Sequence, residues 1–424
     1  MEVVILMLKK LSLFTVAFVL LSVILSACSE SKSGGADDSE ELTVWAAPFA
    51  PKENAEEEDE MWDDVIASFN EEYPDVEVTV RKIPWDNRDQ KILTAISSGE
   101  GPDLFYALPN KIPQYVEEEM IIPLDEYMDD INIDNFEDSS MTPAMYNDQQ
   151  YGIPILQQAY VFFYNVDLIE EIGKDPDSLP ETWEEFDEWA KAAKEEGLYI
   201  QDYAGAGSLN QRFYPLLWQA GGEVLNDDEE VIINNSEGLE AFKRINNMYE
   251  NGWVSEESIN AKRENNELLK EDIIATRGSA QELQILQDSD INFKIGPPLK
   301  KGEHDPVTFG TTGMLSVAST SDNQEIAVEF AKNMTKEEIQ KQFNKTTWYI
   351  PPLKSAKSIH DNDEFMSQIA SYTQYARTGI EHPEDSKIMD QIRSEMQSMM
   401  AGDKTPEKAA DDAAEEIEKI IENN

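Results

Sequence analysis

The chain has few of the residues that bind metals or form disulfides. Its 424 residues include one cysteine, Cys28, and three histidines, His304, His360 and His382. A lone cysteine cannot form an intramolecular disulfide, and the histidines lie far apart without a second ligand at the spacing of zinc motifs. We therefore expect neither a metal centre nor another cofactor.

Basic residues are scarce as well. The chain has 34 Lys and Arg against 86 Asp and Glu, which gives a formal net charge of −52 and a pI near 4.2. Such a charge repels nucleic acid phosphates and anionic lipid headgroups, so we expect neither as a partner. The acidic residues are spread over the whole sequence, which favours a solvated surface over a polycation-binding role. A saline and an alkaline habitat would both account for them.

Signatures of catalysis are also missing. The sequence contains no G-x-S-x-G, H-E-x-x-H or G-x-x-x-x-G-K-[ST] motif. The segment GAGS at 205–208 lacks the third glycine and the preceding strand of a dinucleotide site, so we expect a loop there. Pairs of acidic residues suited to glycoside hydrolysis can be found anywhere among 86 carboxylates, so they do not identify a glycosidase. We expect a protein that is not an enzyme, with a secreted carbohydrate-active enzyme as an alternative.

A long apolar run lies near the N-terminus. Lys9 and Lys10 precede the apolar segment 11–27, an order typical of export signals, and the run is short for a membrane span. The residues LSAC at 25–28 resemble a bacterial lipobox, in which the cysteine is acylated and the chain is cut just before it. We therefore expect a lipoprotein signal peptide over 1–27 and a lipid such as palmitate on Cys28.

The residues after Cys28 fit a lipid-anchored protein. Residues 28–40 are small and polar, so they predict a flexible tether. The expected location is the extracellular face of the cytoplasmic membrane, in a bacterium of the Gram-positive type. A start at Met7 would give a more usual signal peptide than a start at Met1, and both remain open.

The exported part is longer than a chain that folds around one ordinary core, so we expect two α/β lobes. The order of patterns between residues 42 and 107 favours a mainly parallel sheet with helices packed on it. Thr182 with Glu185 predicts a capping box, and Thr405 with Pro406 predicts a helix start. The first predicted elements are a strand at 42–45, a helix at 62–69, a strand at 76–80, a helix at 87–98 and a strand at 104–107.

Aromatic residues at loops and strand ends are candidates for ligand contact. Flat apolar rings beside amides and carboxylates suit a sugar, because the ring covers C–H surface and the polar groups orient the hydroxyls. Core packing is an equally good interpretation for the tryptophans among them. We expect Trp62, Trp183, Trp189 and Trp253 to be core residues. The candidates for ligand contact are Trp45, Trp85, Tyr106, Trp218, Trp348 and Tyr349.

Several segments, taken in order, resemble the extracellular solute-binding proteins of ABC importers, in the maltose-binding-like carbohydrate group. The resemblance covers about residues 41–420, and its order and spacing are more specific than any single motif. One departure is EDIIATRGSA, where the family has a G-K-A-A-M segment. The matching segments include FNEEYPDVEVTV, SSGEGPDLFYA, EEEMIIPLDEYM, YGIPILQQAYVFFYNVDLIEEIG, LPETWEEF, YIPPLKSA and GDKTPEKAADDAAEEI.

The resemblance implies a two-lobed, periplasmic-binding-protein-like clamp with a ligand cleft between the lobes. Lobe one would comprise 41–155 plus 297–334, and lobe two 156–296 plus 335–424. Each lobe would be a mainly parallel sheet flanked by helices. The ligand would be a sugar or oligosaccharide, captured by hinge closure and delivered to the permease subunits of an ABC transporter. A non-sugar solute is the alternative, and the receptor is expected to be a monomer.

The same resemblance suggests which polar side chains contact the ligand. Gln157 and Gln158 lie in the predicted crossover between the lobes, where a solvated hinge amide is the competing interpretation. Arg277 lies in the segment that departs from the family pattern, and a surface ion pair is its competing interpretation. These three side chains are the predicted hydrogen-bonding partners of the ligand.

Overall fold

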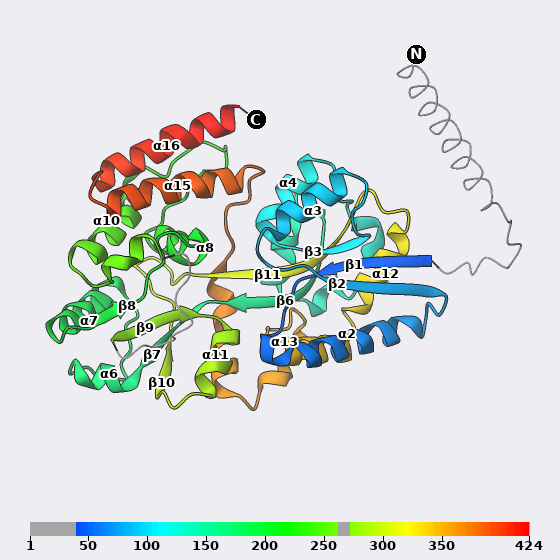
Figure 1. The fold of residues 1–424 in the computed structure, drawn as a ribbon, viewed down its shortest axis with the longest axis horizontal. Coiled ribbons are helices and arrows are strands. Elements are labelled where there is room, and N and C mark those ends of the chain that lie inside the picture. Colours follow the sequence, from blue (N-terminus) through cyan, green and yellow to red (C-terminus); the bar gives the residue numbers. More distant parts are fainter. Residues whose placement is uncertain (1–39, 262–271, 424) are drawn as a thin grey trace, which may run out of the picture. The chain divides into compact units, whose positions relative to one another are not determined.

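A computed structural model describes residues 40–261 and 272–423, which form one compact unit (Figure 1). Cys28, the predicted signal peptide and nearly all of the predicted tether lie outside these residues. None of the helices in the two described ranges has the length and apolar character needed to cross a membrane.

The first half of this unit is built on a six-stranded sheet. Its strand order is β12-β11-β3-β1-β2, and β6 also pairs with β11. The strands are β1 (Glu40–Ala46), β2 (Val76–Lys82), β3 (Leu104–Ala107), β6 (Ile153–Ala159), β11 (Thr308–Val317) and β12 (Ala376–Arg377). The helices around it are α2 (Ala55–Asn70), α3 (Arg88–Ser97), α4 (Ile112–Glu117), α5 (Asp138–Met141), α12 (Gln324–Asn333) and α13 (Glu337–Thr347).

Apolar cores cover both faces of the first sheet. Side chains alternate between faces along a strand, so Phe105 and Tyr106 of β3 enter different cores. Trp62 of α2 packs in the same core as Tyr106. This core also receives Phe343 of α13, an element that the sequence assigns to lobe two. The predicted lobe boundaries stay a prediction, and Phe343 argues for moving α13 to the first half.

The second half is built on a four-stranded sheet in the order β10-β7-β9-β8. Its strands are β7 (Val161–Asn165), β8 (Tyr199–Gln201), β9 (Ile273–Gly278) and β10 (Phe293–Gly296). Trp183, Trp189 and Trp253 are buried in its main core, as expected from the sequence. The helices of this half are α6 (Val166–Glu171), α7 (Trp183–Glu195), α8 (Leu209–Arg212), α9 (Tyr214–Gln219), α10 (Ser236–Glu250), α11 (Ala280–Gln287), α14 (Glu364–Ser371), α15 (Asp385–Met400) and α16 (Pro406–Glu422).

The strand directions follow from how the chain crosses between the halves. In the first sheet β1 is parallel to β2 and β3, whereas β11 is antiparallel to β3 and β6. In the second sheet β7 is antiparallel to both β9 and β10, so the expectation of a mainly parallel sheet is wrong there. The chain enters the second half along β7 directly after β6 and returns along β11 (Figure 1). Of these crossing strands, β7 is antiparallel to both of its neighbours, whereas β11 is antiparallel to β3 and β6 but parallel to β12.

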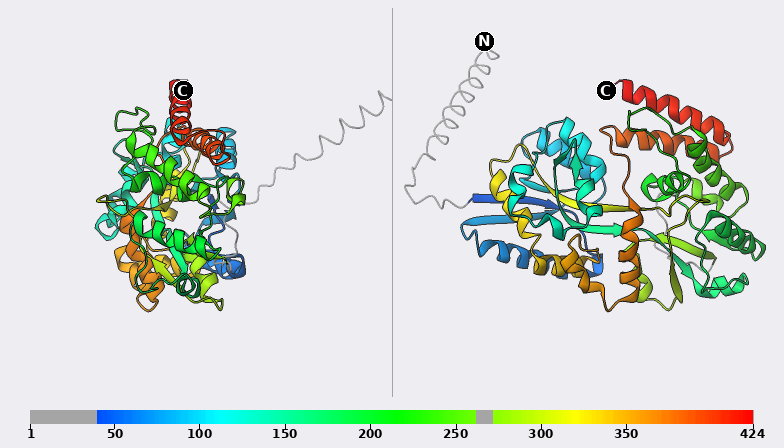
Figure 2. Two further views of the ribbon diagram at one scale, coloured as in Figure 1. Left: turned by 90° about the vertical axis from the view of Figure 1, so that its left-hand side faces the viewer. Right: turned by 180° about the vertical axis from the view of Figure 1, so that it is seen from behind.

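Helix ends agree with the capping patterns in the sequence. Thr182 and Glu185 form a complete capping box at the start of α7. Thr405 caps α16, with Pro406 in its first turn. In the view from behind, α15 and α16 pack together on the second half (Figure 2).

Candidate functional site

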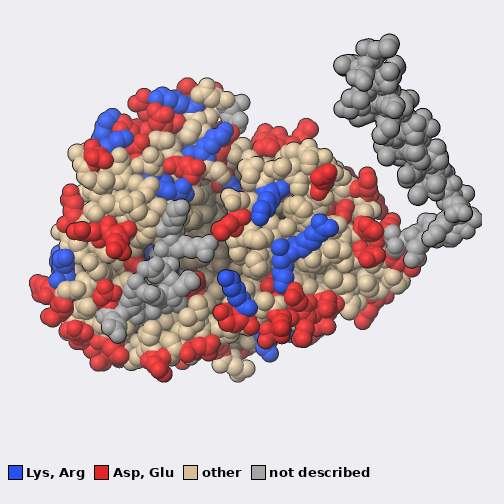
Figure 3. All heavy atoms as spheres, viewed as in Figure 1, with Lys and Arg blue, Asp and Glu red and all other residues tan. Residues whose placement is uncertain are grey.

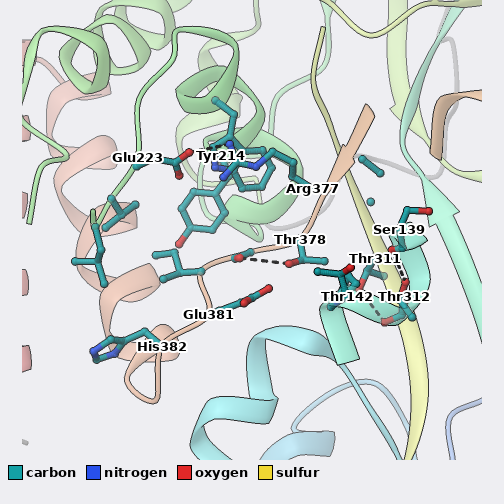
Figure 4. A pocket seen from close by; sticks show the side chains of 18 of the residues that line it. Ser139, Thr142, Tyr214, Glu223, Thr311, Thr312, Arg377, Thr378, Glu381 and His382 are labelled. Carbon is teal, nitrogen blue, oxygen red and sulfur yellow. Dashed lines mark hydrogen bonds and ion pairs between the residues drawn. The ribbon is translucent and has the colours of Figure 1, made fainter. Parts of the chain in front are cut away.

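A cavity of about 870 Å³ lies where the two halves meet. Figure 3 shows a hollow between the halves on the face drawn there, with both acidic and basic side chains on the surface around it. Figure 4 shows the cavity with side chains from α5 and β11 of the first half and from α9 of the second. β6, the segment 376–382 and residues between 223 and 232 also line it.

The wall from the first half is a small polar cluster. Gln157 of β6 pairs with Thr312 of β11 in the register of the sheet. The Nε2 of Gln157 donates to the Oγ of Ser139 at 3.0 Å, and the Oγ1 of Thr312 donates to the backbone oxygen of Ser139 at 3.3 Å. The Oε1 of Gln157 has no partner, although the residue is only 3% exposed. A buried acceptor without a donor is costly, so a ligand donor would be stabilised there.

The opposite wall is an aromatic and charged stack. Tyr214 and Trp218 are one helical turn apart on α9, with ring centroids 5.7 Å apart and an interplanar angle of 29°. The Arg377 guanidinium lies 4.7 Å from the Trp218 ring centroid, and Glu223 pairs with it at 2.8 Å. The Tyr214 hydroxyl is buried without a partner, and burial raises the pKa of this phenol, so it is a neutral donor.

The charge around the cavity is mostly negative. Arg377 is the single Lys or Arg that the described lining contains. Partial burial raises the pKa of the Glu381 carboxyl, and Arg377 opposes this rise. The backbone N–H of Glu384 donates to Nδ1 of His382 at 3.0 Å. Such a lining disfavours an anionic ligand. The carboxylates that line the cavity are Asp138, Glu223, Asp227, Glu229 and Glu381.

Three of the residues predicted from sequence line this cavity, namely Gln157, Gln158 and Trp218. Gln158 is half-buried. Trp218 is only 6% exposed, and its ring already contacts Tyr214 and Arg377. We therefore interpret Trp218 as a ring that positions the Tyr214 hydroxyl and the Arg377 guanidinium, rather than as one that stacks on a ligand.

Three other predicted residues gather in a different place, around Phe49. The Phe49 ring centroid lies 6.3 Å from that of Trp85, 4.8 Å from that of Tyr106 and 6.2 Å from that of Tyr349. The Arg88 guanidinium lies 5.0 Å from the Trp85 centroid and 4.9 Å from that of Tyr106. We call Phe49, Trp85, Arg88, Tyr106 and Tyr349 the aromatic cluster. Its members do not line the cavity.

The last three predicted residues stand apart from both groups. Trp45 packs on the core that contains Phe105. Trp348 ends α13 in the left-handed conformation, with φ of 60°, and packs on the core of β7 and α11. Arg277 of β9 donates to the backbone oxygen of Gln211 at 2.6 Å, and burial and Arg212 lower its pKa to about 9. None of these three residues lines the 870 Å³ cavity.

The lining residues that sequence reasoning missed include Ser139, Tyr214, Thr312 and Arg377. The spacing of Tyr214 and Trp218 is a visible helical signal that could have identified the tyrosine. The others depend on the strand register and on the return of the chain at β12, which no local pattern encodes.

A second cavity of about 1760 Å³ borders Asp202 and Tyr203 of the second half and Asp86 of the first. None of the nine residues predicted to contact ligand lines it. Burial raises the pKa of the Asp202 carboxyl to about 6, and Thr276 donates to both of its oxygens. We regard the smaller cavity as the better site, because several segments of both halves line it.

Comparison with known proteins places the chain in a class. Among solved structures, an ABC substrate-binding protein of Listeria monocytogenes in complex with cycloalternan matches with a TM-score of 0.78 at 22% identity, over 91% of this chain and 99% of that one. The GacH receptor of Streptomyces glaucescens, solved unliganded and with acarbose, matches with a TM-score of 0.76 at 16% identity, over the same 91% and 99%. The fold is the two-lobed fold of periplasmic binding proteins.

The family follows from sequence. The family described as bacterial extracellular solute-binding protein matches residues 64–373, which is most of the chain. The chain is also 25% identical over 434 residues to the galactooligosaccharide-binding protein of Bacillus subtilis strain 168, with 96% of each protein covered. The chain belongs to the family of bacterial extracellular solute-binding proteins, which bind rather than convert their solutes.

Proposed function

We propose that this protein is the receptor of an ABC importer for a neutral sugar or oligosaccharide. The observation that carries the proposal is the pair of buried, unpartnered polar groups in one cavity, the Oε1 of Gln157 and the hydroxyl of Tyr214. A sugar hydroxyl both donates and accepts, so hydroxyls of one ligand could serve both groups. Relatives named for galactooligosaccharide, maltotriose and arabinooligosaccharide support the ligand class.

The proposed contacts come from both halves. Gln157, Gln158, Ser139 and Thr312 would bind hydroxyls from the first half, and Tyr214 with Arg377 from the second. A ligand bound to both walls favours the closed arrangement, because it contacts both walls only when they are close together. The importer permease would then recognise the closed receptor.

We further propose that Cys28 carries the lipid that holds the receptor at the outer face of the cytoplasmic membrane, in a Gram-positive type of cell. The support is the LSAC pattern and the polar tether behind it. Replacing Cys28 with alanine should leave the protein unacylated and out of the membrane fraction, while ligand binding stays unchanged. Intact-mass measurement and fractionation would check this. A C28A chain that still gains an acyl mass would refute it.

The test of the ligand class is a thermal-shift screen of the purified chain against neutral mono- and oligosaccharides, uronic acids, glycerol phosphate, amino acids and peptides. Selective stabilisation by one neutral sugar class is the expected result, since a ligand that binds only the native state raises the melting temperature. Stabilisation by glycerol phosphate alone would instead support the alternative of a non-sugar receptor. Glycerol phosphate is included because one relative is named a glycerol-3-phosphate-binding protein.

An enzyme alternative is tested in the same samples. The stabilising oligosaccharide is incubated with the protein and analysed for shorter products. Binding without turnover is expected, whereas turnover that is lost when one cavity carboxylate, such as Glu381, becomes glutamine would overturn the receptor proposal.

A further inference from the structure

Arg377, the one arginine in the described lining of the 870 Å³ cavity, lies between a ring and a carboxylate. Its guanidinium lies 4.7 Å from the ring centroid of Trp218, and its Nη1 pairs with Oε1 of Glu223 at 2.8 Å (Figure 4). Trp218 packs in the main core of the second half, so its ring is a rigid support for the cation. The position of the guanidinium is therefore set by the ring and by Glu223 together.

The backbone around Glu223 is held in place on both sides. A Cβ added at Gly222 would lie 2.7 Å from Cδ1 of Leu217, so the chain packs closely just before Glu223. Just after it, Val224 is buried in the main core of the second half, and its backbone oxygen accepts from the backbone N–H of Ile232 at 2.9 Å. The Glu223 side chain thus starts from a fixed point beside the guanidinium.

The pair faces the open volume of the cavity. Arg377 reaches it from β12, which pairs in parallel with the start of β11, so that Phe309 lies opposite Arg377 in the register. The side chains of Arg377 and Glu223 are 45% and 40% exposed, and both residues line the cavity. A solute in the cavity can therefore approach both charges.

Glu223 differs from the other carboxylates of the lining in its contact with the cation. Among the described residues, it is the ion-pair partner that the structure gives Arg377. A carboxylate elsewhere in the lining repels an anionic solute through a field that salt screens within about 10 Å at 0.1 M. Glu223 competes directly for the N–H groups of the guanidinium. The other carboxylates are Asp138, Asp227, Glu229 and Glu381.

We propose that Glu223 determines the charge selectivity of the cavity: it occupies Arg377, so that neutral sugars are accepted and sugars that carry a carboxylate are excluded. A guanidinium binds a carboxylate through paired, parallel hydrogen bonds, and this is the contact that a uronic acid would make. With Glu223 in place, a uronate has to displace a carboxylate that is already bound. A neutral hydroxyl needs only one N–H group, and the guanidinium carries several.

This inference rests on the proposed sugar receptor, and its test compares a neutral saccharide with its own uronate. The neutral probe is the saccharide that gives the largest shift in the thermal screen. The acidic probe is the same saccharide with its primary hydroxymethyl groups oxidised to carboxylates, as in the pair galactobiose and digalacturonate. Calorimetry on the full chain gives both dissociation constants. For the parent protein we expect the neutral probe to bind at least about tenfold more tightly.

The decisive variant is Glu223→Gln, which removes the charge and keeps the size of the side chain. The ratio of the uronate dissociation constant to the neutral one should fall by about tenfold or more, because the guanidinium is released for the uronate. The melting temperature should change little, because a half-exposed ion pair contributes little to stability. In the double variant E223Q/R377Q the fall in the ratio should disappear, because it depends on the guanidinium.

A matched control removes a lining carboxylate that is not paired with Arg377. Asp227→Asn changes the total charge of the lining by the same amount, and the ratio should change by no more than about threefold. If Asp227→Asn changes the ratio as much as Glu223→Gln does, total charge sets the selectivity and the proposal is overturned. An unchanged ratio in Glu223→Gln, a uronate that binds neither protein, or a fall that persists in E223Q/R377Q would each overturn it as well.

Failure of this inference can be told apart from failure of the receptor proposal. If a neutral saccharide binds the parent protein while the ratio does not respond to Glu223→Gln, the selectivity role of Glu223 is refuted and the sugar receptor stands. If no neutral saccharide binds the parent protein, the sugar receptor is refuted, and the selectivity role falls with it.

Discussion

The aromatic cluster and the cavity contain similar residue types in different surroundings. Both combine tyrosine and tryptophan rings with an arginine, and both drew attention in the sequence for the same chemical reason. In the aromatic cluster the rings fill the space between them, and Tyr106 and Tyr349 are buried to 1% and 6% exposure. Around the cavity similar groups border about 870 Å³ of open volume. Residue type suggests a binding site, but open volume is required for one.

Polar groups sharpen the same contrast. In the aromatic cluster the Nε1 of Trp85 donates to the backbone oxygen of Pro48 at 3.1 Å, and the Arg88 guanidinium pairs with Asp89 at 2.8 Å while it lies over two rings, although the Nη1 of Arg88 is buried without a partner. At the cavity Gln157 and Tyr214 each present a buried atom with no partner. The aromatic cluster is therefore expected to matter for stability and the cavity for binding.

The largest expected effect is in the aromatic cluster. Tyr106→Ala removes a fully buried ring that contacts Phe49 and Arg88, and we expect a loss of about 3–5 kcal/mol in the free energy of unfolding. Denaturant unfolding measures it. A loss below about 1 kcal/mol together with lost ligand binding would reverse the assignment of the two regions.

The next effect concerns the cavity. Tyr214→Phe deletes a buried hydroxyl without a partner, so the free energy of unfolding should stay the same or rise slightly. Binding of the sugar selected by the thermal screen should weaken by about 1–3 kcal/mol, as measured by calorimetry. The paired control is Tyr164→Phe, which deletes another unpartnered buried hydroxyl in the core of the second half and should leave binding unchanged.

A smaller effect is expected at the edge of the aromatic cluster. Trp85 is 43% exposed, so Trp85→Ala should destabilise the protein by only about 1–2 kcal/mol. Ligand binding should stay within a factor of two of the parent protein, roughly 0.4 kcal/mol. A much larger loss of affinity, at unchanged stability, would mean that the ligand extends to this ring and that the two regions form one site.

The smallest effect is a pH dependence at the cavity. The folded pKa of Glu381 is raised by burial, so the native state holds this proton more tightly than the unfolded chain does. Its contribution therefore stabilises the protein at low pH and is lost as the pH rises through the folded pKa. Glu381→Gln should remove this pH-dependent contribution to the free energy of unfolding. We expect it to be less than about 1 kcal/mol, because the side chain is solvent-accessible. Unfolding curves of the parent protein and of the Glu381→Gln variant, measured between pH 4 and 7, would check this prediction. A difference in the free energy of unfolding that is the same at all pH values would contradict it.

Much of the fold follows from local patterns. The strand at β2 and the helix at α2 are confirmed because alternation and helical spacing describe one buried face each. The capping residues Thr182 and Thr405 mark helix starts because their side chains satisfy free N–H groups in the first turn. The antiparallel direction of β7 escaped prediction, because strand direction in a sheet depends on where the chain enters it.

The candidate site was less accessible to sequence reasoning. Gln157 lies at the crossover that the sequence pointed to, but its partner Ser139 and its neighbour Thr312 come together only through the register of β6 with β11. Trp218 was chosen as a stacking ring, whereas the structure covers it with Arg377, which lies more than 150 residues later in the chain.

By itself, the sequence determined the class of protein: an acidic, cysteine-poor chain with alternating strand and helix patterns and the ordered segments of a solute-binding family. These features depend on composition and on contacts between residues that are close together in the chain, and both can be read directly from the sequence. Only the tertiary structure decided which aromatic residues are packing and which border open space, and which charges face each other across the two halves. Those properties depend on volume and burial, which arise when distant segments such as Lys111 and Asp385 come into contact.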